Sequence, residues 1–222
     1  MPPKVLKPEF TGKRFYVHQI FGLLGDTELP PLFRDNQFIT KKWCIDNNYT
    51  YRFWDTQSCD NLIKKYPEFE ELYYSVKYPI MRVDIIRFII LHYYGGLYLD
   101  MDCRPNIDSI DTEIFAAAFK EGRKKHFEIE VLQSNPCNHI LIKFLNYVVK
   151  QIEEKDKIEI YDTWRARYVY QTTGPYSFNR FIKKEKINIH KYIINEPLTF
   201  DKSLNLNGNE DFISHYSCSY IR

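Results

Sequence analysis

The chain of 222 residues lacks any apolar run long enough to cross a bilayer, which takes about 20 consecutive residues. Its first residues, Met1-Pro2-Pro3-Lys4, also lack the apolar core of a signal peptide. We therefore expect a soluble protein of the cytoplasm, with no membrane span, and the composition fits a viral or bacterial source.

An excess of charge of one sign is also lacking, because the formal net charge is only +2 and the pI is near 8.1. The basic clusters are short, so no nucleic-acid partner is expected. Five cysteines, an odd number, show no Cys-X-X-Cys spacing. This pattern favours reduced thiols over a disulfide framework or a zinc site. There is no repeat and no low-complexity segment.

The composition fits one compact domain spanning residues 1–222, with residues 1–12 as a loose arm. Hydrophobic residues make up 44% and charged residues 27%, as in ordinary soluble proteins. Tyrosine and phenylalanine are abundant, at 18 and 16 residues. Aromatic rings suit a cleft that binds sugars or bases. Compositional drift in an AT-rich genome explains the same excess, and the choice stays open.

Strand and helix patterns alternate along the chain. Strands are predicted at 14–20, 50–54, 97–101 and 128–134, and helices at 35–47, 58–66, 79–94, 138–153 and 175–184. This order predicts an α/β fold with a mainly parallel sheet covered by helices. Ligands of such sheets lie beyond the carboxyl ends of the strands, where Phe21 and Asp100 fall.

The most informative segment is Gly95 to Asp102, which closes a helix and opens a strand. Side chains of a strand alternate between its faces, so Tyr98, Asp100 and Asp102 are expected on one face and core residues on the other. Paired carboxylates at a strand end suit Mg²⁺ or Mn²⁺ that also binds substrate phosphates. The alternative is an ordinary half-buried strand that ends in a polar turn.

The helix predicted at 79–94 is strongly apolar, with Pro79 in its first turn and two glycines after its end. Asp84 and Arg87 interrupt it at a spacing of three, which places both on one face. They either pair with each other as a structural unit or face the same cleft as the two strand-end carboxylates.

These residues together resemble a known family. Asp84-X-X-Arg87 followed by Gly95-Gly96-X-Tyr98-X-Asp100-X-Asp102 is similar to the signature of family 32 nucleotide-sugar glycosyltransferases. That group includes an initiating mannosyltransferase, capsular sugar transferases and, distantly, the catalytic domains of clostridial glucosylating toxins. Other segments resemble the family in the same order along the chain. They are His18-Gln19-Ile20-Phe21 near the start, Thr173-Gly174-Pro175 past the centre and His215 near the end. Phe21 replaces the usual Trp, and the Ser-Trp that commonly follows the late His is absent.

The resemblance implies a GT-A type fold, a single Rossmann-like domain, and a divalent cation, Mn²⁺ or Mg²⁺. Asp102, expected to be exposed at the strand end, would ligate the metal directly, with Asp100 and His215 as further metal contacts. Asp84, Arg87, Asp100 and Asp102 form the implied catalytic set. The residues implied to bind the donor are His18, Gln19, Phe21, Asp84, Arg87, Gly96, Tyr98 and Asp100.

The implied activity is retaining transfer of a sugar from a nucleotide-diphosphate donor, with a UDP-sugar as first choice and GDP-mannose next. The acceptor would be a glycan or a protein-linked glycan. The alternative is a degenerate, non-catalytic module that binds nucleotide sugars or glycans. A metal-dependent phosphohydrolase is disfavoured because such enzymes need more carboxylates around the metals. Since eukaryotic relatives are anchored in the Golgi, a Golgi-lumenal protein without its anchor is the alternative location.

Overall fold

The computed structural model describes residues 15–105, 108, 110–120, 126–157, 165–194 and 213–215. Its helices are α1 (Pro31–Asp46), α2 (Thr56–Ile63), α3 (Pro67–Ser75), α4 (Pro79–Tyr94), α5 (His139–Lys155), α7 (Arg165–Thr172) and α8 (Pro175–Glu185). Its strands are β1 (Tyr16–Ile20), β2 (Thr50–Trp54), β3 (Gly96–Leu99), β4 (Cys103–Pro105), β5 (Ala116–Lys120), β6 (His126–Ser134), β7 (His190–Ile194) and β8 (Ile213–His215). The predicted arm at 1–12 lies outside the described residues.

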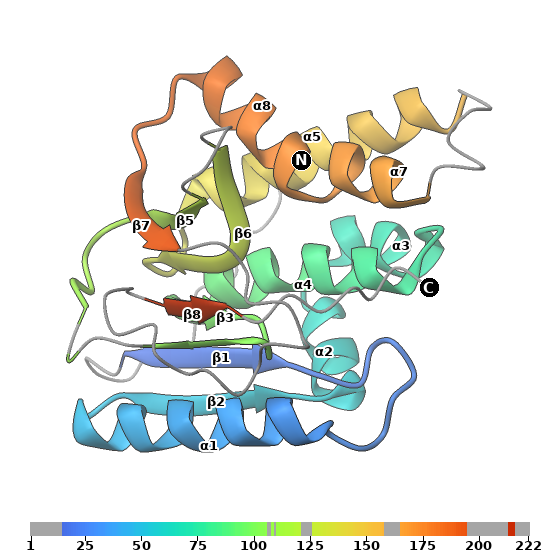
Figure 1. Cartoon of the computed structure of the whole chain (residues 1–222). Helices are drawn as coiled ribbons and strands as arrows, with labels where there is room; N and C mark the ends of the chain where they lie inside the picture. The colour runs from blue at the N-terminus through green and yellow to red at the C-terminus, as the bar shows by residue number, and fades with distance from the viewer. Residues whose placement is uncertain are drawn as a thin grey trace.

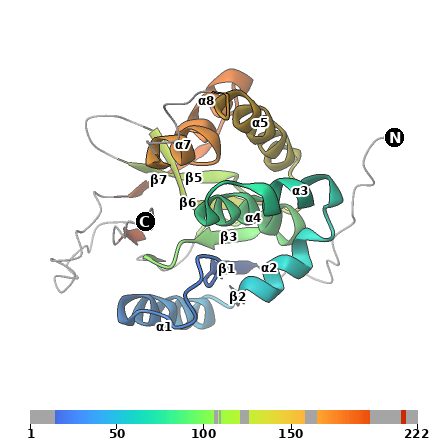
Figure 2. The same ribbon diagram turned by 90° about the vertical axis from the view of Figure 1, so that its right-hand side faces the viewer.

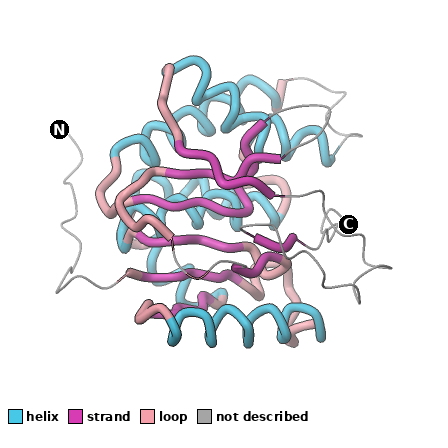
Figure 3. The backbone as a smooth tube through the Cα atoms, turned by 60° about the vertical axis from the view of Figure 1, so that its left-hand side comes forward, coloured by secondary structure: helices cyan, strands magenta, loops and turns pink. Residues whose placement is uncertain are grey.

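One sheet organises the described residues, with the strand order β2-β1-β3-β6-β5-β7-β8-β4. Figure 3 shows the strands in magenta and the helices in cyan. β1 pairs in parallel with β2 and β3, and β7 does so with β5 and β8. β6 runs antiparallel to both β3 and β5, and β4 runs antiparallel to β8. The predicted α/β class is confirmed, with parallel pairs interrupted at β6 and β4.

The two faces of the sheet are covered by different helices. The larger core cluster joins residues of α2, α3, α4, α5 and α8 to one face, including Tyr98 of β3. The smaller cluster joins Trp43 and Cys44 of α1 to Leu97 and Leu99 on the opposite face. Figure 1 shows α1 beside β2, and Figure 2 shows α2, α3 and α4 grouped together, separated from α1 by β1 and β2. Both faces of β3 are therefore buried.

Local sequence accounts for several boundaries. α4 and β2 have the predicted bounds, whereas α1 begins at Pro31, four residues earlier than predicted, because Pro31 occupies its first turn. β3 ends at Leu99, so the strand predicted to 101 is too long. Helices α3 and α7 and strands β4, β5, β7 and β8 were not predicted. No helix in the described ranges has the length and apolar character needed to cross a membrane.

Two glycines connect α4 to β3 in a conformation that other residues rarely adopt. Gly95 and Gly96 have φ angles of 65° and 97°. A Cβ atom on Gly96 would lie 2.2 Å from the carbonyl oxygen of Tyr16, because β3 approaches β1 closely there. The glycine pair therefore fixes how closely β3 lies against β1, and so where the segment after β3 begins.

Candidate active site

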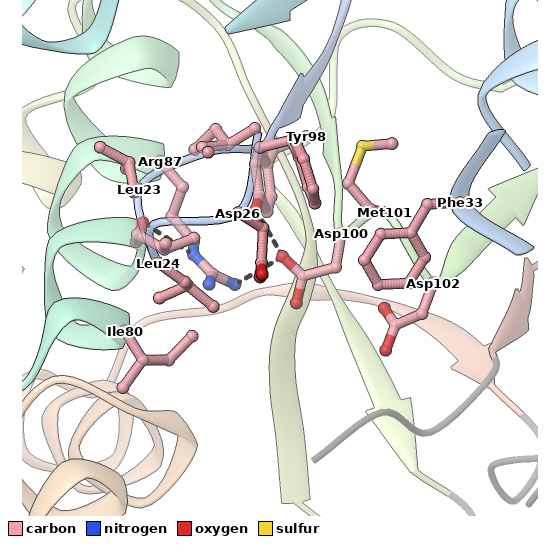
Figure 4. A pocket seen from close by; sticks show the side chains of 14 residues that line it. Leu23, Leu24, Asp26, Phe33, Ile80, Arg87, Tyr98, Asp100, Met101 and Asp102 are labelled. Carbon is pink, nitrogen blue, oxygen red and sulfur yellow. Dashed lines mark hydrogen bonds and ion pairs between the residues drawn. The ribbon is translucent and has the colours of Figure 1, made fainter. Parts of the chain in front are cut away.

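A pocket lies beyond the carboxyl ends of β1 and β3, beside α4 (Figure 4). It is lined by Ile20, Phe21, Gly22, Leu23, Leu24, Asp26, Phe33, Ile80, Val83, Arg87, Tyr98, Asp100, Met101 and Asp102. Its mostly apolar wall with a few polar groups is typical of small-molecule sites. The position agrees with the prediction that ligands bind at the strand ends.

The residues Asp100, Met101 and Asp102, called the carboxylate turn below, follow β3 directly. The N–H of Asp100 donates to the carbonyl of Glu130 at 2.9 Å, and the N–H of Cys103 donates to the carbonyl of Asp100 at 3.0 Å. The chain thus bends immediately after β3 and re-enters a strand at Cys103. Asp102 therefore leaves the alternation predicted for it, although both carboxylates line the same pocket.

Two buried carboxamides hold this turn by its backbone. Gln19 Nε2 donates to the Asp100 carbonyl at 3.3 Å, and Asn36 Nδ2 donates to the Met101 carbonyl at 3.1 Å. Tyr51 fixes Gln19 in turn, because its hydroxyl donates to Gln19 Oε1 at 3.0 Å. Gln19 is fully buried and does not line the pocket, so it supports the turn instead of facing a donor. Sequence reasoning missed Asn36, which lies in α1 without any local signal.

Arg87 lies at the centre of the polar groups. Its Nη2 donates to Asp84 Oδ1 at 2.9 Å, its Nη1 donates to the Ile129 carbonyl at 2.8 Å, and Nη1 lies 3.3 Å from Asp100 Oδ1. The guanidinium carbon is 4.8 Å from the centre of the Tyr98 ring, and the Tyr98 hydroxyl donates to Asp100 Oδ1. Figure 4 shows Arg87 reaching from α4 toward Asp100. The second oxygen of Asp100, Oδ2, is in no hydrogen bond or ion pair described for this site.

The Ile129 carbonyl reaches Arg87 where β6 is irregular. The pairing of β5 with β6 shifts register between Ala117 and Ala118, whose partners on β6 are Leu132 and Glu128. The intervening residues of β6 include Ile129 and Glu130, whose carbonyls bind Arg87 and the carboxylate turn. Irregular strand pairing beside a site is a recurrent means of redirecting backbone groups.

Asp84 has both carboxylate oxygens engaged inside the protein. Oδ1 accepts from Arg87 and Oδ2 accepts from Thr173 Oγ1 at 2.7 Å. Burial raises the pKa of Asp84, and the Arg87 charge and the Thr173 hydrogen bond oppose that rise. Asp84 does not line the pocket. It therefore joins Arg87 to the Thr173-Gly174-Pro175 segment, a link that spacing along the chain did not reveal.

The pKa of Asp100 is shifted by its surroundings. Its pKa is raised to about 6, chiefly by burial and also by the nearby Asp102 carboxylate, while Arg87 and the Tyr98 hydrogen bond act in the opposite direction. Asp102 is only 6% exposed, so the expectation of an exposed carboxylate is wrong. It is buried because β4 begins directly after it and α1 packs against β4.

His18 does not reach the pocket. It is fully buried, its Nε2 lies 2.9 Å from the Gly95 carbonyl, and its Nδ1 accepts from Trp54 Nε1 at 3.1 Å. The carbonyl can only accept, so Nε2 carries the proton and the ring is neutral. Burial lowers the pKa of His18 to about 3. The ring thus connects β1, β2 and the glycine pair and supports the site from within the core.

Phe21 does line the pocket, half-buried, with its ring edge-on to Phe33 at a centroid distance of 6.1 Å. Gly96 is buried against β1 and does not line it. Sequence reasoning missed Leu23, Leu24, Asp26, Phe33, Ile80 and Met101 among the lining residues. The glycines at 22 and 25, both with positive φ, were the available sign of a turn that brings residues 23 to 26 to the pocket.

The late histidine lies in β8. Its backbone pairs opposite Cys103, the residue that follows Asp102, so the chain returns to the carboxylate turn at this point. Its role as a metal ligand stays a prediction.

The residues of the turn fit a divalent cation that arrives with its substrate. Among the described residues, no group of three or more His, Cys, Asp and Glu side chains forms a cage for a metal ion. Mg²⁺ is commonly bound by one or two carboxylates together with substrate phosphates and water. Asp100 and Asp102 supply this number of carboxylates in one pocket.

Comparisons with known proteins agree with this geometry. Residues 34–117 match the family described as glycosyltransferase sugar-binding region containing DXD motif. The mannosyl phosphorylinositol ceramide synthase CSH1 of Saccharomyces cerevisiae is 43% identical over 139 residues, which are 60% of this chain and 34% of that protein. An uncharacterized glycosyltransferase of Acanthamoeba polyphaga mimivirus is 27% identical over 186 residues, 79% of this chain and 72% of that protein. The chain thus spans about a third of the length of the yeast relative.

Among solved structures, the PaToxG glycosyltransferase superposes with a TM-score of 0.56 at 16% identity, covering 78% of this chain and 69% of that one. This likeness concerns the fold. The DXD motif of the matched region corresponds to Asp100 and Asp102 of the carboxylate turn. The chain therefore has the GT-A type fold, and its residues 34–117 match the sugar-binding region with a DXD motif, as the resemblance implied.

Proposed function

We propose that the protein transfers a hexose, mannose first, from a nucleoside-diphosphate sugar to a hydroxyl acceptor. The observation that carries the proposal is the convergence of Asp100, Asp102 and Arg87 on one pocket at the carboxyl ends of β1 and β3. A binding relic has little reason to retain this buried charged set, because each buried charge is costly unless it is paired.

The residues divide the work by their positions. A divalent cation held at Asp102 and Asp100 would supply Lewis-acid stabilisation to the diphosphate as it leaves. Arg87 and Tyr98 both contact Asp100 Oδ1, so they aim its other oxygen at the pocket. Asp84 holds Arg87 and acts on the donor through it, because its own oxygens are occupied. Phe21 offers a ring face at the pocket wall for the base.

The donor preference rests on the relatives. The yeast protein is named for mannosyl transfer. So is an inositol phosphoceramide mannosyltransferase of Schizosaccharomyces pombe, which is 39% identical over 83 residues. GDP-mannose therefore moves ahead of a UDP-sugar as the donor. Retention of the anomeric configuration follows the family resemblance. It is tested by proton NMR of the first product formed.

The test is a screen of GDP-mannose, UDP-glucose, UDP-galactose and UDP-N-acetylglucosamine, each with Mn²⁺, Mg²⁺ or chelator, measuring released nucleoside diphosphate. We expect slow metal-dependent hydrolysis of one donor without acceptor. Asp102→Asn should abolish it, since removing one stabilising group of this kind costs about 10²–10³ in kcat. Binding of nucleotide sugars without turnover would instead identify a non-catalytic module. Full turnover in chelator would remove the metal from the proposal.

A further inference from the structure

Two exposed tyrosines contact each other on α7 and α8, the helices that flank Thr173. Tyr170 of α7 and Tyr176 of α8 are 43% and 47% exposed, and their ring centres lie 5.7 Å apart. His126 of β6 extends the group, with its ring 6.0 Å from that of Tyr176. His126 Nε2 lies 2.6 Å from Glu128 Oε1. These four residues, Tyr170, Tyr176, His126 and Glu128, are called the aromatic platform below.

The platform is rigidly built although its rings are exposed. Asn179 of α8 accepts from the Phe127 N–H at 2.8 Å and donates to the Phe127 carbonyl and to the Pro175 carbonyl. This residue ties β6, between His126 and Glu128, to the helix that carries Tyr176. Gly174 lets α7 and α8 meet closely, because a Cβ there would lie 2.9 Å from the Tyr170 Cα. Rigid aromatic surfaces bind with little loss of conformational entropy.

The same elements lead directly to the carboxylate turn. Thr173, three residues after Tyr170, donates to Asp84, and Ile129, next to Glu128, accepts from Arg87. The electrostatics agree with this proximity. Burial raises the pKa of Tyr170, and the charges of Glu128, Glu130 and Asp84 raise it further. The platform is therefore linked to the pocket through Arg87, which lines the pocket and is bound both by Asp84, the partner of Thr173, and by the Ile129 carbonyl.

We propose that the aromatic platform binds the acceptor, a polyhydroxylated ring, beside the pocket that holds the donor. The inference rests on the proposed function and adds the acceptor surface to it. The tyrosine faces would cover the apolar C–H face of the ring, and their hydroxyls would bond its edge. Glu128 is only 9% exposed and holds His126 in place at the edge of the two rings. Two sources share this chemistry, a hexose glycan and the inositol headgroup of a lipid.

The experiment compares Tyr170→Ala and Tyr176→Ala with the ring-retaining Phe variants. The matched control is Tyr74→Ala, which removes a tyrosine of α3 with a similar exposure of 40%. For each variant, released nucleoside diphosphate and transferred sugar are measured together with the preferred donor. One arm uses α-methyl mannoside as acceptor and the other uses inositol phosphoceramide in detergent micelles.

We expect the acceptor KM to rise about tenfold in each Ala variant, the scale of one aromatic contact. The Phe variants should change it less than about threefold, and Tyr74→Ala should not change it. The arm that shows transfer identifies the source of the ring. An unchanged acceptor KM in both Ala variants, with normal transfer, would overturn the proposal.

A second measurement separates this inference from the proposed function. Saturation-transfer NMR with α-methyl mannoside or inositol 1-phosphate reports ring contact without turnover. If wild type turns over no donor, the proposed function fails, but a signal lost in Tyr170→Ala and Tyr176→Ala and kept in Tyr74→Ala would still support the platform. No signal with either probe for wild type, at concentrations up to tens of millimolar, would overturn the platform by itself.

Discussion

At the scale of single residues, Thr173 shows how a distant motif acts on the site. Its hydroxyl donates a hydrogen bond to Asp84 Oδ2, while Asp84 Oδ1 accepts one from Arg87. Thr173→Val keeps the shape but leaves that buried oxygen unpaired, which costs about 1–3 kcal/mol. We expect a lower melting temperature and a lower kcat/KM for donor hydrolysis.

The control for this change is Thr173→Ser, which keeps the hydroxyl. It should restore both melting temperature and activity to near the wild-type values. Equal losses in the Ser and Val variants would show that the methyl group, and not the hydrogen bond to Asp84, is what matters.

His18 gives a residue-scale prediction about pH. Its pKa is lowered to about 3 by burial, whereas an unfolded histidine titrates near 6.5. The unfolded state thus binds the additional proton between these values, so the contribution of His18 to stability is complete above pH 6.5 and declines as pH falls toward 3. Nitrogen-15 NMR of the ring should show the neutral tautomer, protonated at Nε2, down to pH 4.5. A ring that titrates near 6.5 in the folded protein would contradict the buried network.

At the scale of elements, the connection from α4 to β3 requires a glycine at position 96. Gly96→Ala places a methyl group 2.2 Å from the Tyr16 carbonyl and keeps a strained φ. Gly25→Ala is the matched control, because Gly25 has a φ of 96° but no atom within 4 Å of the added Cβ. Both variants bear the backbone cost, and Gly96→Ala should be less stable by a further 1–3 kcal/mol or so. Equal stabilities in urea denaturation would show that β1 yields to the added methyl.

Elements with their own end signals could be predicted, and those without could not. α4 has Pro79 at its start and Gly95 after its end, and both bounds match. β5 reads Ala-Ala-Ala-Phe-Lys, which favours no strand, and it forms only because β6 and β7 pair with it. The extent of β3 was overestimated because alternation continues to Met101, while the turn closed by the Cys103 N–H on the Asp100 carbonyl ends the strand.

The candidate site shows the same division. Spacing and the resemblance both indicated Arg87, Asp100 and Asp102, which line the pocket, and Asp84, which holds Arg87, while their catalytic roles stay predictions. The roles of His18 and Gln19 differ from expectation, since a motif reveals which residues recur and not whether they face a ligand or the core. Asn36 and Ile129 were missed because their contributions come from pairings across distant segments.

At the scale of the whole molecule, ligand binding should appear as a coupled gain in thermal stability. Two carboxylates alone hold a cation weakly, so Mn²⁺ or GDP added singly should shift the melting temperature little. Added together at 100 times their joint dissociation constant, they should contribute about 2.7 kcal/mol. For a protein of this size that corresponds to roughly 5–11 °C in differential scanning calorimetry. Additive shifts would indicate two independent sites, and Asp102→Asn should remove the joint gain.

The carboxylate turn is held by Gln19 and Asn36 through its carbonyl groups and by Glu130 through an N–H. None of these three bonds involves the side chains at 100 or 102. Carboxamides also do not titrate, so the path of the chain there is independent of acidity. The side chains at positions 100 and 102 can therefore change by mutation without loss of the hydrogen bonds that hold the backbone. Mutation can exchange the groups presented to the pocket while the main chain keeps its course, which leaves this turn open to evolve new ion or sugar preferences.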